Sequence, residues 1–146
     1  FGVSNFLPWQ FDLLQARLDF PLVTNQIELS ALHLAPLHDG TLDQAQRLRR
    51  PPMAWSPLAG GRLLDAHDER AGRVRAALEA VGRELGGAAV DQVALAWLLR
   101  HPARVLPVLG SGRIERIHAA AMAEGLRLDR QQWFAIWEAS AGREVP

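Results

Sequence analysis

Short apolar runs alternate with helical patterns along the whole chain, and this alternation limits the folds available to it. The runs are the strand tail at 1–5 and the segments 22–27, 51–56 and 105–109. They are too short for helices, and each is followed by apolar residues at helical spacing. Single strands that alternate with helices pair in parallel through right-handed crossovers, and runs that are apolar throughout are typical of strands buried on both faces. The sequence therefore predicts an α/β fold with a parallel sheet.

Helix boundaries follow from proline, glycine and capping residues. Thr41 with Gln44 and Asp129 with Gln132 predict capping boxes, and Asp91 predicts a further N-cap. The segment Ser30–Gly40 is expected to be a loop, and Pro57–Gly61 a glycine-bearing loop. The predicted helices span 8–19, 41–50, 68–85, 91 to the residues before Pro102, 113–123 and 129–141.

Four βα units plus an extra C-terminal helix in 146 residues fit two architectures. One is a small doubly wound sheet, which is complete at this length. The other is the C-terminal half of a parallel (β/α)8 TIM barrel, a fold that takes about 250 residues. The pattern alone favours the doubly wound sheet, whereas a start at Phe1 with the first methionine at Met53 favours the half-barrel. We expect residues 1–146 to be one half of a single barrel domain whose N-terminal half is absent from this chain.

Composition excludes several classes of function. Sixteen basic residues balance sixteen acidic ones, so charge gives no reason to expect a nucleic-acid or membrane partner. The absence of cysteine removes disulfide and thiolate chemistry and fits a cytoplasmic protein. All positive side chains are arginine and there is no tyrosine, so no mechanism that needs a lysine amine or a tyrosine phenol can run within these residues. The five histidines lack the spacing of metal ligands, and no metal site is expected.

Polar side chains gather where the predicted strands end, which is where barrels place their functional groups. These positions hold Ser4 and Asn5, then Gln26 and Glu28, then Trp55 and Ser56. Amides and hydroxyls beside a Trp suit a ligand with an amide and a flat ring. The alternative is that Asn5 and Ser56 only cap turns and that Trp55 fills the core.

Gly110-Ser111-Gly112-Arg113 joins the last predicted strand to a helix. Glycines let the backbone approach a ligand, and a helix N-terminus attracts phosphate. Arg113 and Arg116 lie on one side of the first helical turn, where both can reach a phosphate. The glycine spacing of dinucleotide-binding folds and the Walker lysine are both missing. A plain turn with two solvated arginines remains the alternative.

Together these segments resemble the aldo-keto reductase family in the family's order. The residues that carry the resemblance are Phe1-Gly-Val-Ser-Asn-Phe6 (fifth barrel strand), Thr24-Asn-Gln-Ile-Glu28 (sixth), Ala54-Trp-Ser-Pro-Leu58 (seventh), Gln92–Leu99 (the helix before the eighth) and Leu106–Arg116 (the eighth strand and its phosphate loop).

The resemblance implies a cofactor site for NADP(H). Ser4, Asn5 and Gln26 would hydrogen-bond the nicotinamide carboxamide, and Trp55 would stack on its ring. Ser56 and Leu58 would contact the pyrophosphate, and Ser111, Arg113 and Arg116 would face the 2′-phosphate. Pro57, Gly110 and Gly112 complete the predicted cofactor-binding residues. Two positions depart from the family pattern, because Ala120 stands where Asn is common and Gly110 where many members have Lys.

The resemblance also implies an NADPH-dependent oxidoreductase that reduces aldehydes or ketones to alcohols. The family's catalytic Asp, Tyr, Lys and His come from strands two to four, so this chain alone is predicted to be inactive. Its expected partners are a small carbonyl substrate and the missing N-terminal half of the barrel. The alternative is a non-catalytic reductase-like subunit that binds nucleotide or a protein partner.

Overall fold

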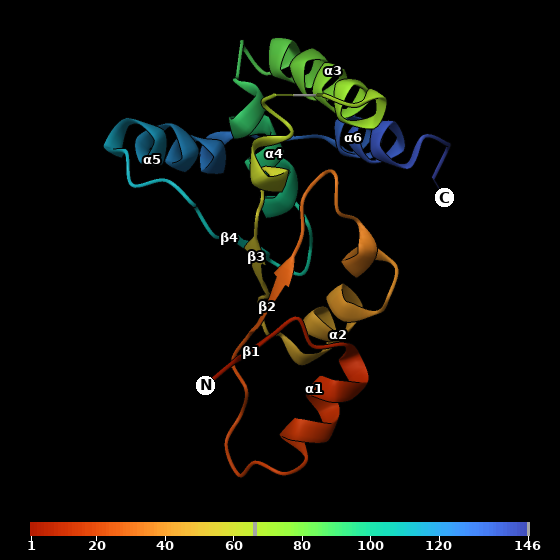
Figure 1. The fold of residues 1–146 in the computed structure, drawn as a ribbon, viewed down its shortest axis with the longest axis vertical. Coiled ribbons are helices and arrows are strands. Elements are labelled where there is room, and N and C mark those ends of the chain that lie inside the picture. The colour runs from red at the N-terminus through yellow and green to blue at the C-terminus, as the bar shows by residue number, and fades with distance from the viewer. Residues whose placement is uncertain (66, 146) are drawn as a thin grey trace.

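Four parallel strands form one sheet, and their spatial order is the same as their order in the chain. The computed structural model describes residues 1–65 and 67–145, with β1 at Val3–Ser4, β2 at Asn25–Glu28, β3 at Met53–Trp55 and β4 at Leu106–Pro107 (Figure 1). All three strand pairs are parallel. A doubly wound sheet reverses its strand order at a switch point, whereas a barrel adds strands in sequence. The order β1-β2-β3-β4 therefore rejects the doubly wound alternative and agrees with half a barrel.

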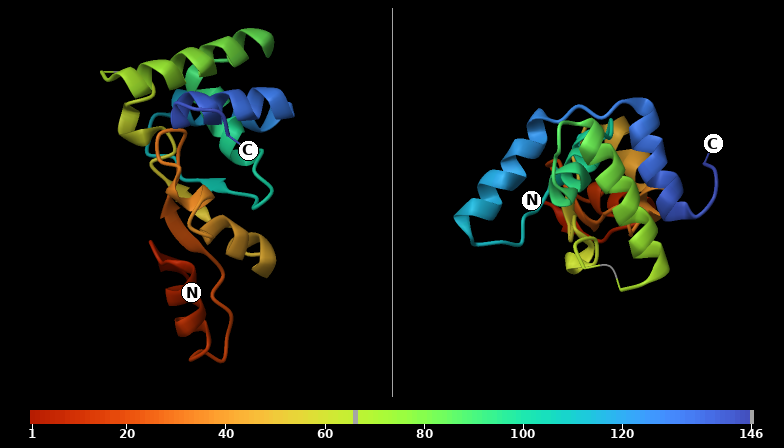
Figure 2. Two further views of the ribbon diagram at one scale, coloured as in Figure 1. Left: turned by 90° about the vertical axis from the view of Figure 1, so that its right-hand side faces the viewer. Right: turned by 90° about the horizontal axis from the view of Figure 1, so that it is seen from above.

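A helix or helix pair follows each strand, as the alternation in the sequence predicts. The helices are α1 (Pro8–Gln15), α2 (Thr41–Leu48), α3 (Glu69–Glu84), α4 (Val90–Leu99), α5 (Ile114–Ala121) and α6 (Arg130–Ala141), and short 3-10 turns lie at Ala35–Leu37, Ala59–Gly61 and Met122–Gly125. Figures 1 and 2 show α3 and α6 side by side, while α5 stands out to one side. In the described part of the chain, no helix is long and apolar enough to cross a membrane.

The core lies between the sheet and the helices. Ile27 and Ala54 are paired in register on β2 and β3, and both are buried. Trp97 of α4 and Leu78 of α3 are buried in the same cluster. Burial of such apolar side chains is the main term that stabilises this layer. The helical layer thereby holds the strand ends, and the loops that follow them, in fixed positions.

The last helix is tied to α3 through its C-terminal carbonyls. Nε of Arg70 donates to the carbonyl oxygen of Ser140 at 2.9 Å, and Nη2 donates to the Ser140 hydroxyl at 3.0 Å. Carbonyls in the last helical turn have no partner within the helix, so this arginine satisfies one of them and joins the two helices.

Of the three predicted N-terminal helix caps, two are wrong. Thr41 and Gln44 form no capping box, because Gly40 is the N-cap and Asp39 accepts the Thr41 N–H at 2.9 Å. Gln44 instead donates to the Pro8 carbonyl at 2.8 Å. Asp91 is not an N-cap either, because Ala89 is the N-cap and the helix starts at Val90. The third start is confirmed.

In that third start, Asp129 accepts the Gln132 N–H at 2.8 Å, and the Gln132 side chain accepts the Asp129 N–H at 3.0 Å. The predicted segments around α1 and β4 are longer than the observed ones. The helix expected over 8–19 ends at Gln15. The strand expected over 105–109 pairs only at Leu106–Pro107.

Candidate cofactor site

The carboxyl ends of β1, β2 and β3 bring four of the predicted site residues together. Ser4 and Gln26 are register partners, and the Ser4 hydroxyl donates to the Gln26 carbonyl oxygen at 3.1 Å. The Asn5 backbone N–H donates to the same oxygen at 2.8 Å. Trp55 joins the group through its indole Nε1, which donates to Oδ1 of Asn5 at 2.9 Å. Residues from three segments of the sequence thus form one polar cluster at one edge of the sheet.

Three residues other than glycine adopt left-handed backbone conformations at or just after these strand ends. Asn5 has φ 56°, Ser56 has φ 49° and Ala59 has φ 53°. Such conformations cost an L-residue free energy and are often found at functional sites. Gly60 and Gly61 continue the left-handed run, with φ 64° and 93°. The glycine-bearing loop after β3 is therefore a tight, defined turn, and its Ala59–Gly61 part is a 3-10 turn rather than irregular loop.

Asn25 is a positioning residue that our sequence analysis assigned no role. Its buried side chain accepts the Phe6 N–H at 3.3 Å and donates to the Phe6 carbonyl at 2.7 Å. This pair of bonds fixes the backbone immediately after Asn5 and so fixes where the Asn5 amide lies. The sequence does not distinguish Asn25 from its polar neighbours in β2, Gln26 and Glu28; its burial in the fold is what requires the amide to find partners.

The atoms left free in this cluster fit a carboxamide. Oδ1 of Asn5 is taken by Trp55, which leaves its Nδ2 as a donor, and the Ser4 hydroxyl oxygen can still accept. Within residues 1–65 and 67–145, the Gln26 side-chain amide makes no hydrogen bond, so both its donor and its acceptor atoms remain available to a ligand. Trp55 is partly exposed instead of filling the core. A nicotinamide carboxamide needs one donor and one acceptor partner, and this cluster offers both.

The Gly110–Arg116 segment follows β4 at the same edge of the sheet. An added Cβ at Gly110 or Gly112 would meet nothing within 4 Å, so the space beside this backbone is open. The Arg113 N–H donates to the Ser111 hydroxyl at 3.2 Å, and Arg113 is the N-cap of α5. Arg113 and Arg116 are exposed. Among the described residues, no hydrogen bond joins this segment to the Asn5 and Trp55 cluster, so the two groups are separate parts of one edge.

The side chains of Glu28 and His33 lie close together beside the cluster. Glu28 is the register partner of Trp55, and its Oε2 lies 3.7 Å from Nδ1 of His33. The buried Ser30 hydroxyl accepts the His33 N–H at 3.1 Å and so holds the start of the 30–40 loop.

The comparison with protein families decides the relationship of this chain. The model of the Aldo/keto reductase family matches residues 1–141. The chain belongs to the aldo-keto reductase family. This agrees with the resemblance of the five strand-end segments and with the sequential parallel sheet.

Relatives in this family cover the chain along its full length. The chain is 53% identical over 146 residues to oxidoreductase YdhF of Escherichia coli (strain K12), covering 100% of the chain and 48% of that protein. It is 49% identical over 144 residues to 6-dehydroglucose reductase of Agrobacterium fabrum, covering 99% of the chain and 47% of that protein. The chain therefore spans about half the length of these relatives.

Two solved structures share the fold. A crystal structure of the thermostable aldo-keto reductase Tm1743 with the inhibitor epalrestat superposes with a TM-score of 0.82 at 25% identity, covering 94% of this chain and 47% of that one. The aldose reductase of Giardia lamblia gives a TM-score of 0.77 at 21% identity, covering 99% of this chain and 46% of that one. Both structures confirm the partial-barrel architecture.

Proposed function

We propose that residues 1–146 are the cofactor-binding half of an NADPH-dependent aldo-keto reductase that reduces aldehydes or ketones to alcohols. The observation that carries the proposal is the cluster in which Ser4, Asn5, Gln26 and Trp55 meet at the carboxyl edge of the sheet. Their free donor and acceptor atoms fit the nicotinamide carboxamide, and the indole of Trp55 offers a flat face for the ring. The bound nicotinamide would supply the hydride, and these residues would orient it.

The remaining contacts of the cofactor are assigned to the loops that follow β3 and β4. Ser56, Pro57 and Leu58 lead into the left-handed run at Ala59–Gly61, and this loop would border the pyrophosphate. Gly110, Ser111 and Gly112 leave open space beside their backbone for phosphate oxygens. Arg113 and Arg116 supply exposed guanidinium groups for a 2′-phosphate, which NADPH carries and NADH lacks.

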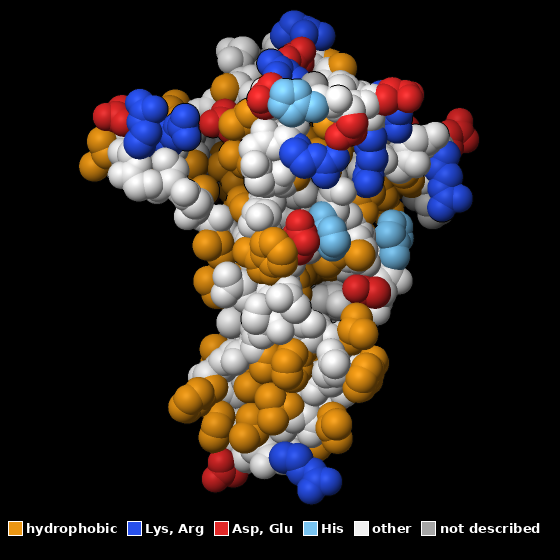
Figure 3. Space-filling view, viewed as in Figure 1, with side chains coloured by type: hydrophobic (Ala, Val, Ile, Leu, Met, Phe, Trp, Pro, Cys, Tyr) orange, Lys and Arg blue, Asp and Glu red, His pale blue; other side chains and the backbone are white. Residues whose placement is uncertain are grey.

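The family resemblance implies a tyrosine as general acid, tuned by a lysine, and residues 1–146 contain neither, so we place the general acid outside these residues. Both free edges of the sheet support a second half. At the β1 edge Trp9 is 63% exposed, and at the β4 edge Ile114 and Met122 of the α5 region are 63% and 68% exposed. Figure 3 shows hydrophobic side chains gathered over the end of the molecule that holds α1. Four further strands with their helices would cover these surfaces and close the barrel.

The substrate is proposed as a small carbonyl compound, and sugar aldehydes are the first class to test. Relatives from Agrobacterium fabrum and from Novosphingobium aromaticivorans, 49% and 41% identical to the chain, are named 6-dehydroglucose reductase. The rim of the proposed site carries Glu28 and His33, and such polar groups suit a substrate rich in hydroxyls.

The test is cofactor binding and turnover by the protein at its full natural length. We expect NADPH to bind more tightly than NADH in calorimetric titrations. Replacing Arg113 and Arg116 together by Ala should weaken NADPH at least about tenfold, since each charge-assisted bond is worth about 1.5–3 kcal/mol, and should leave NADH almost unchanged. Arg83→Ala is the matched control, because Arg83 is an exposed arginine on α3, away from the site.

Turnover on a panel of aldehydes, ketones and sugar aldehydes completes the test. Equal affinity for NADPH and NADH would overturn the assignment of the two arginines. NADPH binding without turnover on the whole panel would favour the non-catalytic subunit. A cytoplasmic location, expected from the lack of cysteine, is tested separately by fractionation of the source cells.

A further inference from the structure

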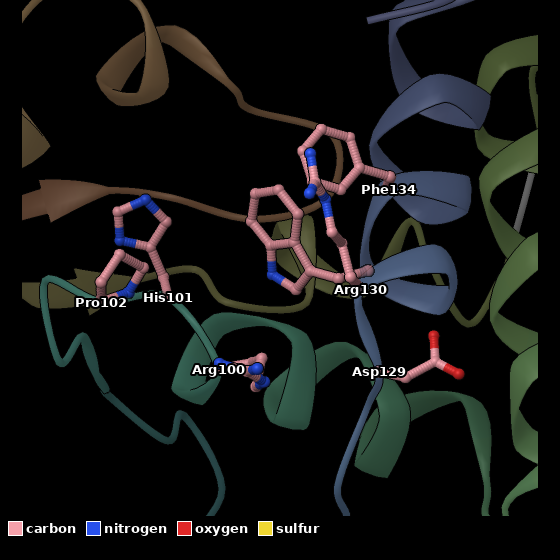
Figure 4. Close-up of a pocket in the computed structure, with 7 residues that line it drawn as sticks. Arg100, His101, Pro102, Asp129, Arg130 and Phe134 are labelled. Carbon is pink, nitrogen blue, oxygen red and sulfur yellow. The ribbon is translucent and has the colours of Figure 1, made fainter. Parts of the chain in front are cut away.

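A pocket of about 290 Å³ lies between the end of α4 and the start of α6. Arg100 and His101 line it from the α4 side, and Arg130, Trp133 and Phe134 line it from α6 (Figure 4). The two sides are tied together, because Nε of Arg100 donates to the Leu128 carbonyl at 3.1 Å. Neither α1 nor α5, the helices beside the two free edges of the sheet, contributes to the lining.

The aromatic wall of this pocket is held rigidly. Trp133 stacks on the buried Trp97, with ring centroids 5.2 Å apart and planes 13° apart. Each indole Nε1 donates to the backbone carbonyl of the other tryptophan at 3.0 Å. Phe134 meets the edge of Trp133 at 5.3 Å. A wall fixed in this way loses little conformational freedom when a flat ring packs on it, so the ordering cost of binding is small.

The polar groups that face the pocket are donors. The guanidinium of Arg130 lies 5.4 Å from the centroid of the Phe134 ring, and Arg100 uses Nε on Leu128, which leaves its terminal nitrogens free to donate. The acidic residue of the lining, Asp129, is engaged as the N-cap of α6. Its carboxylate points away from the other labelled side chains in Figure 4. The lining residues thus carry two guanidinium groups against one carboxylate, and that carboxylate is bonded to the α6 backbone.

His101 adds a neutral donor. Its Nδ1 accepts the Ala103 N–H at 3.1 Å, which leaves the proton on Nε2. Burial lowers the pKa of His101, and the nearby Asp43 carboxylate opposes this only in part. The imidazole is thus uncharged at neutral pH and can donate one N–H.

We propose that this pocket binds a small planar aromatic carboxylate. The ring would lie against the Trp133 and Phe134 wall, and the carboxylate would accept hydrogen bonds from the guanidinium of Arg130, with those of Arg100 and the His101 imidazole beside it. The volume is at the lower end of the range of about 300–1,000 Å³ that is typical of ligand pockets, so one or two fused rings fit and a dinucleotide does not. No step of the proposed reduction depends on this pocket.

The probe is naphthalene-2-carboxylate, titrated into the full-length protein saturated with NADPH. We expect NMR shifts of the His101 imidazole and the Trp133 indole at sub-millimolar probe, with little change at the Trp55 indole. Arg130→Gln should weaken binding about tenfold, because one charge-assisted hydrogen bond is lost. The uncharged probe naphthalene-2-carboxamide should bind unaltered protein more weakly by a similar factor. Arg83→Gln is the matched control and should leave both affinities unchanged.

Three results would overturn the proposal. The first is no shift at His101 and Trp133 with 10 mM probe, and the second is equal affinity for the acid and the amide. The third is an affinity that Arg130→Gln leaves unchanged while near-UV circular dichroism shows the stacked tryptophans intact. Failure of NADPH binding in the same sample would count against the proposed function alone, because the pocket shares no residue with the cofactor site.

Discussion

Two glycines on the same helix should respond in opposite ways to alanine. Gly72 and Gly82 both lie in α3. An added Cβ at Gly72 would meet nothing within 4 Å, whereas one at Gly82 would lie 2.3 Å from the Ala88 carbonyl oxygen and 3.5 Å from Cγ2 of Val93. The Ala88 oxygen cannot easily move away, because the Ala88 N–H donates to the Gly82 carbonyl at 3.0 Å. The comparison of the two glycine-to-alanine substitutions therefore tests the close approach of the Ala88 carbonyl oxygen to Gly82.

The expected magnitudes follow from helix propensity and overpacking. Alanine in place of glycine stabilises a helix interior by about 1 kcal/mol, so Gly72→Ala should raise the free energy of unfolding by about that amount. Forcing a methyl group into a packed site costs about 1–3 kcal/mol, and a backbone atom in the way places Gly82→Ala at the upper end. After the propensity gain, Gly82→Ala should lower the free energy of unfolding by about 2 kcal/mol.

The assay is urea unfolding of the full-length protein, followed by far-UV circular dichroism, with both variants measured beside the unaltered chain. The two variants should differ by about 3 kcal/mol with equal dependence on urea concentration. Equal stabilisation by both substitutions would refute the reasoning, since it would mean that α3 and the Ala88 turn do not approach as closely as described.

Three further predictions concern capping, pH and association. Asp129→Ala removes the side chain that accepts the Gln132 N–H and should cost about 1 kcal/mol in urea unfolding, whereas Asp129→Asn should keep most of the stability; a loss of the same size in both variants would contradict the capping role. Burial lowers the pKa of His101 from 6.5, so below pH 6.5 the unfolded chain binds more protons than the folded chain. The stability contributed by His101 is therefore present above pH 6.5 and falls as the pH drops through the lowered pKa. The urea midpoint should therefore decline from pH 7.5 to pH 5.5 less steeply in His101→Gln than in the unaltered protein, and parallel curves would rule out this contribution. A chain limited to residues 1–146 should self-associate, because the exposed apolar residues at both sheet edges, such as Trp9 and Ile114, have no cover; a monodisperse monomer in analytical ultracentrifugation would count against the half-barrel.

Local rules in the sequence predicted most element types and the better-defined caps. Asp129 with Gln132 forms the expected capping box. Asp68, predicted only as the start of a helix, is the N-cap of α3 and accepts the Ala71 N–H at 2.8 Å. The same rules failed at Thr41, because Gly40 is the N-cap and the Asp39 side chain accepts the Thr41 N–H. Strand lengths were overestimated at β4, which has one neighbouring strand, and also at β3, which has two.

The candidate site was predicted in parts, and the fold showed how the parts join. The sequence indicated Asn5, Gln26 and Trp55 as strand-end residues, but their meeting depends on parallel register across three strands. The Trp55–Asn5 hydrogen bond spans 50 positions in the chain, so no local pattern could reveal it. Asn25 was missed for the same reason, since its partner is the backbone of Phe6, 19 positions away.

What the sequence by itself determined is the alternation of strands and helices, the residues at the strand ends and the absence of tyrosine and lysine. These depend on short-range spacing and on composition, which the chain carries whatever its fold. Only the tertiary structure decided between a doubly wound sheet and half a barrel, because strand order is set by which strands pair across long separations. It also revealed the pocket between α4 and α6, whose two walls meet only when Trp97 and Trp133 stack.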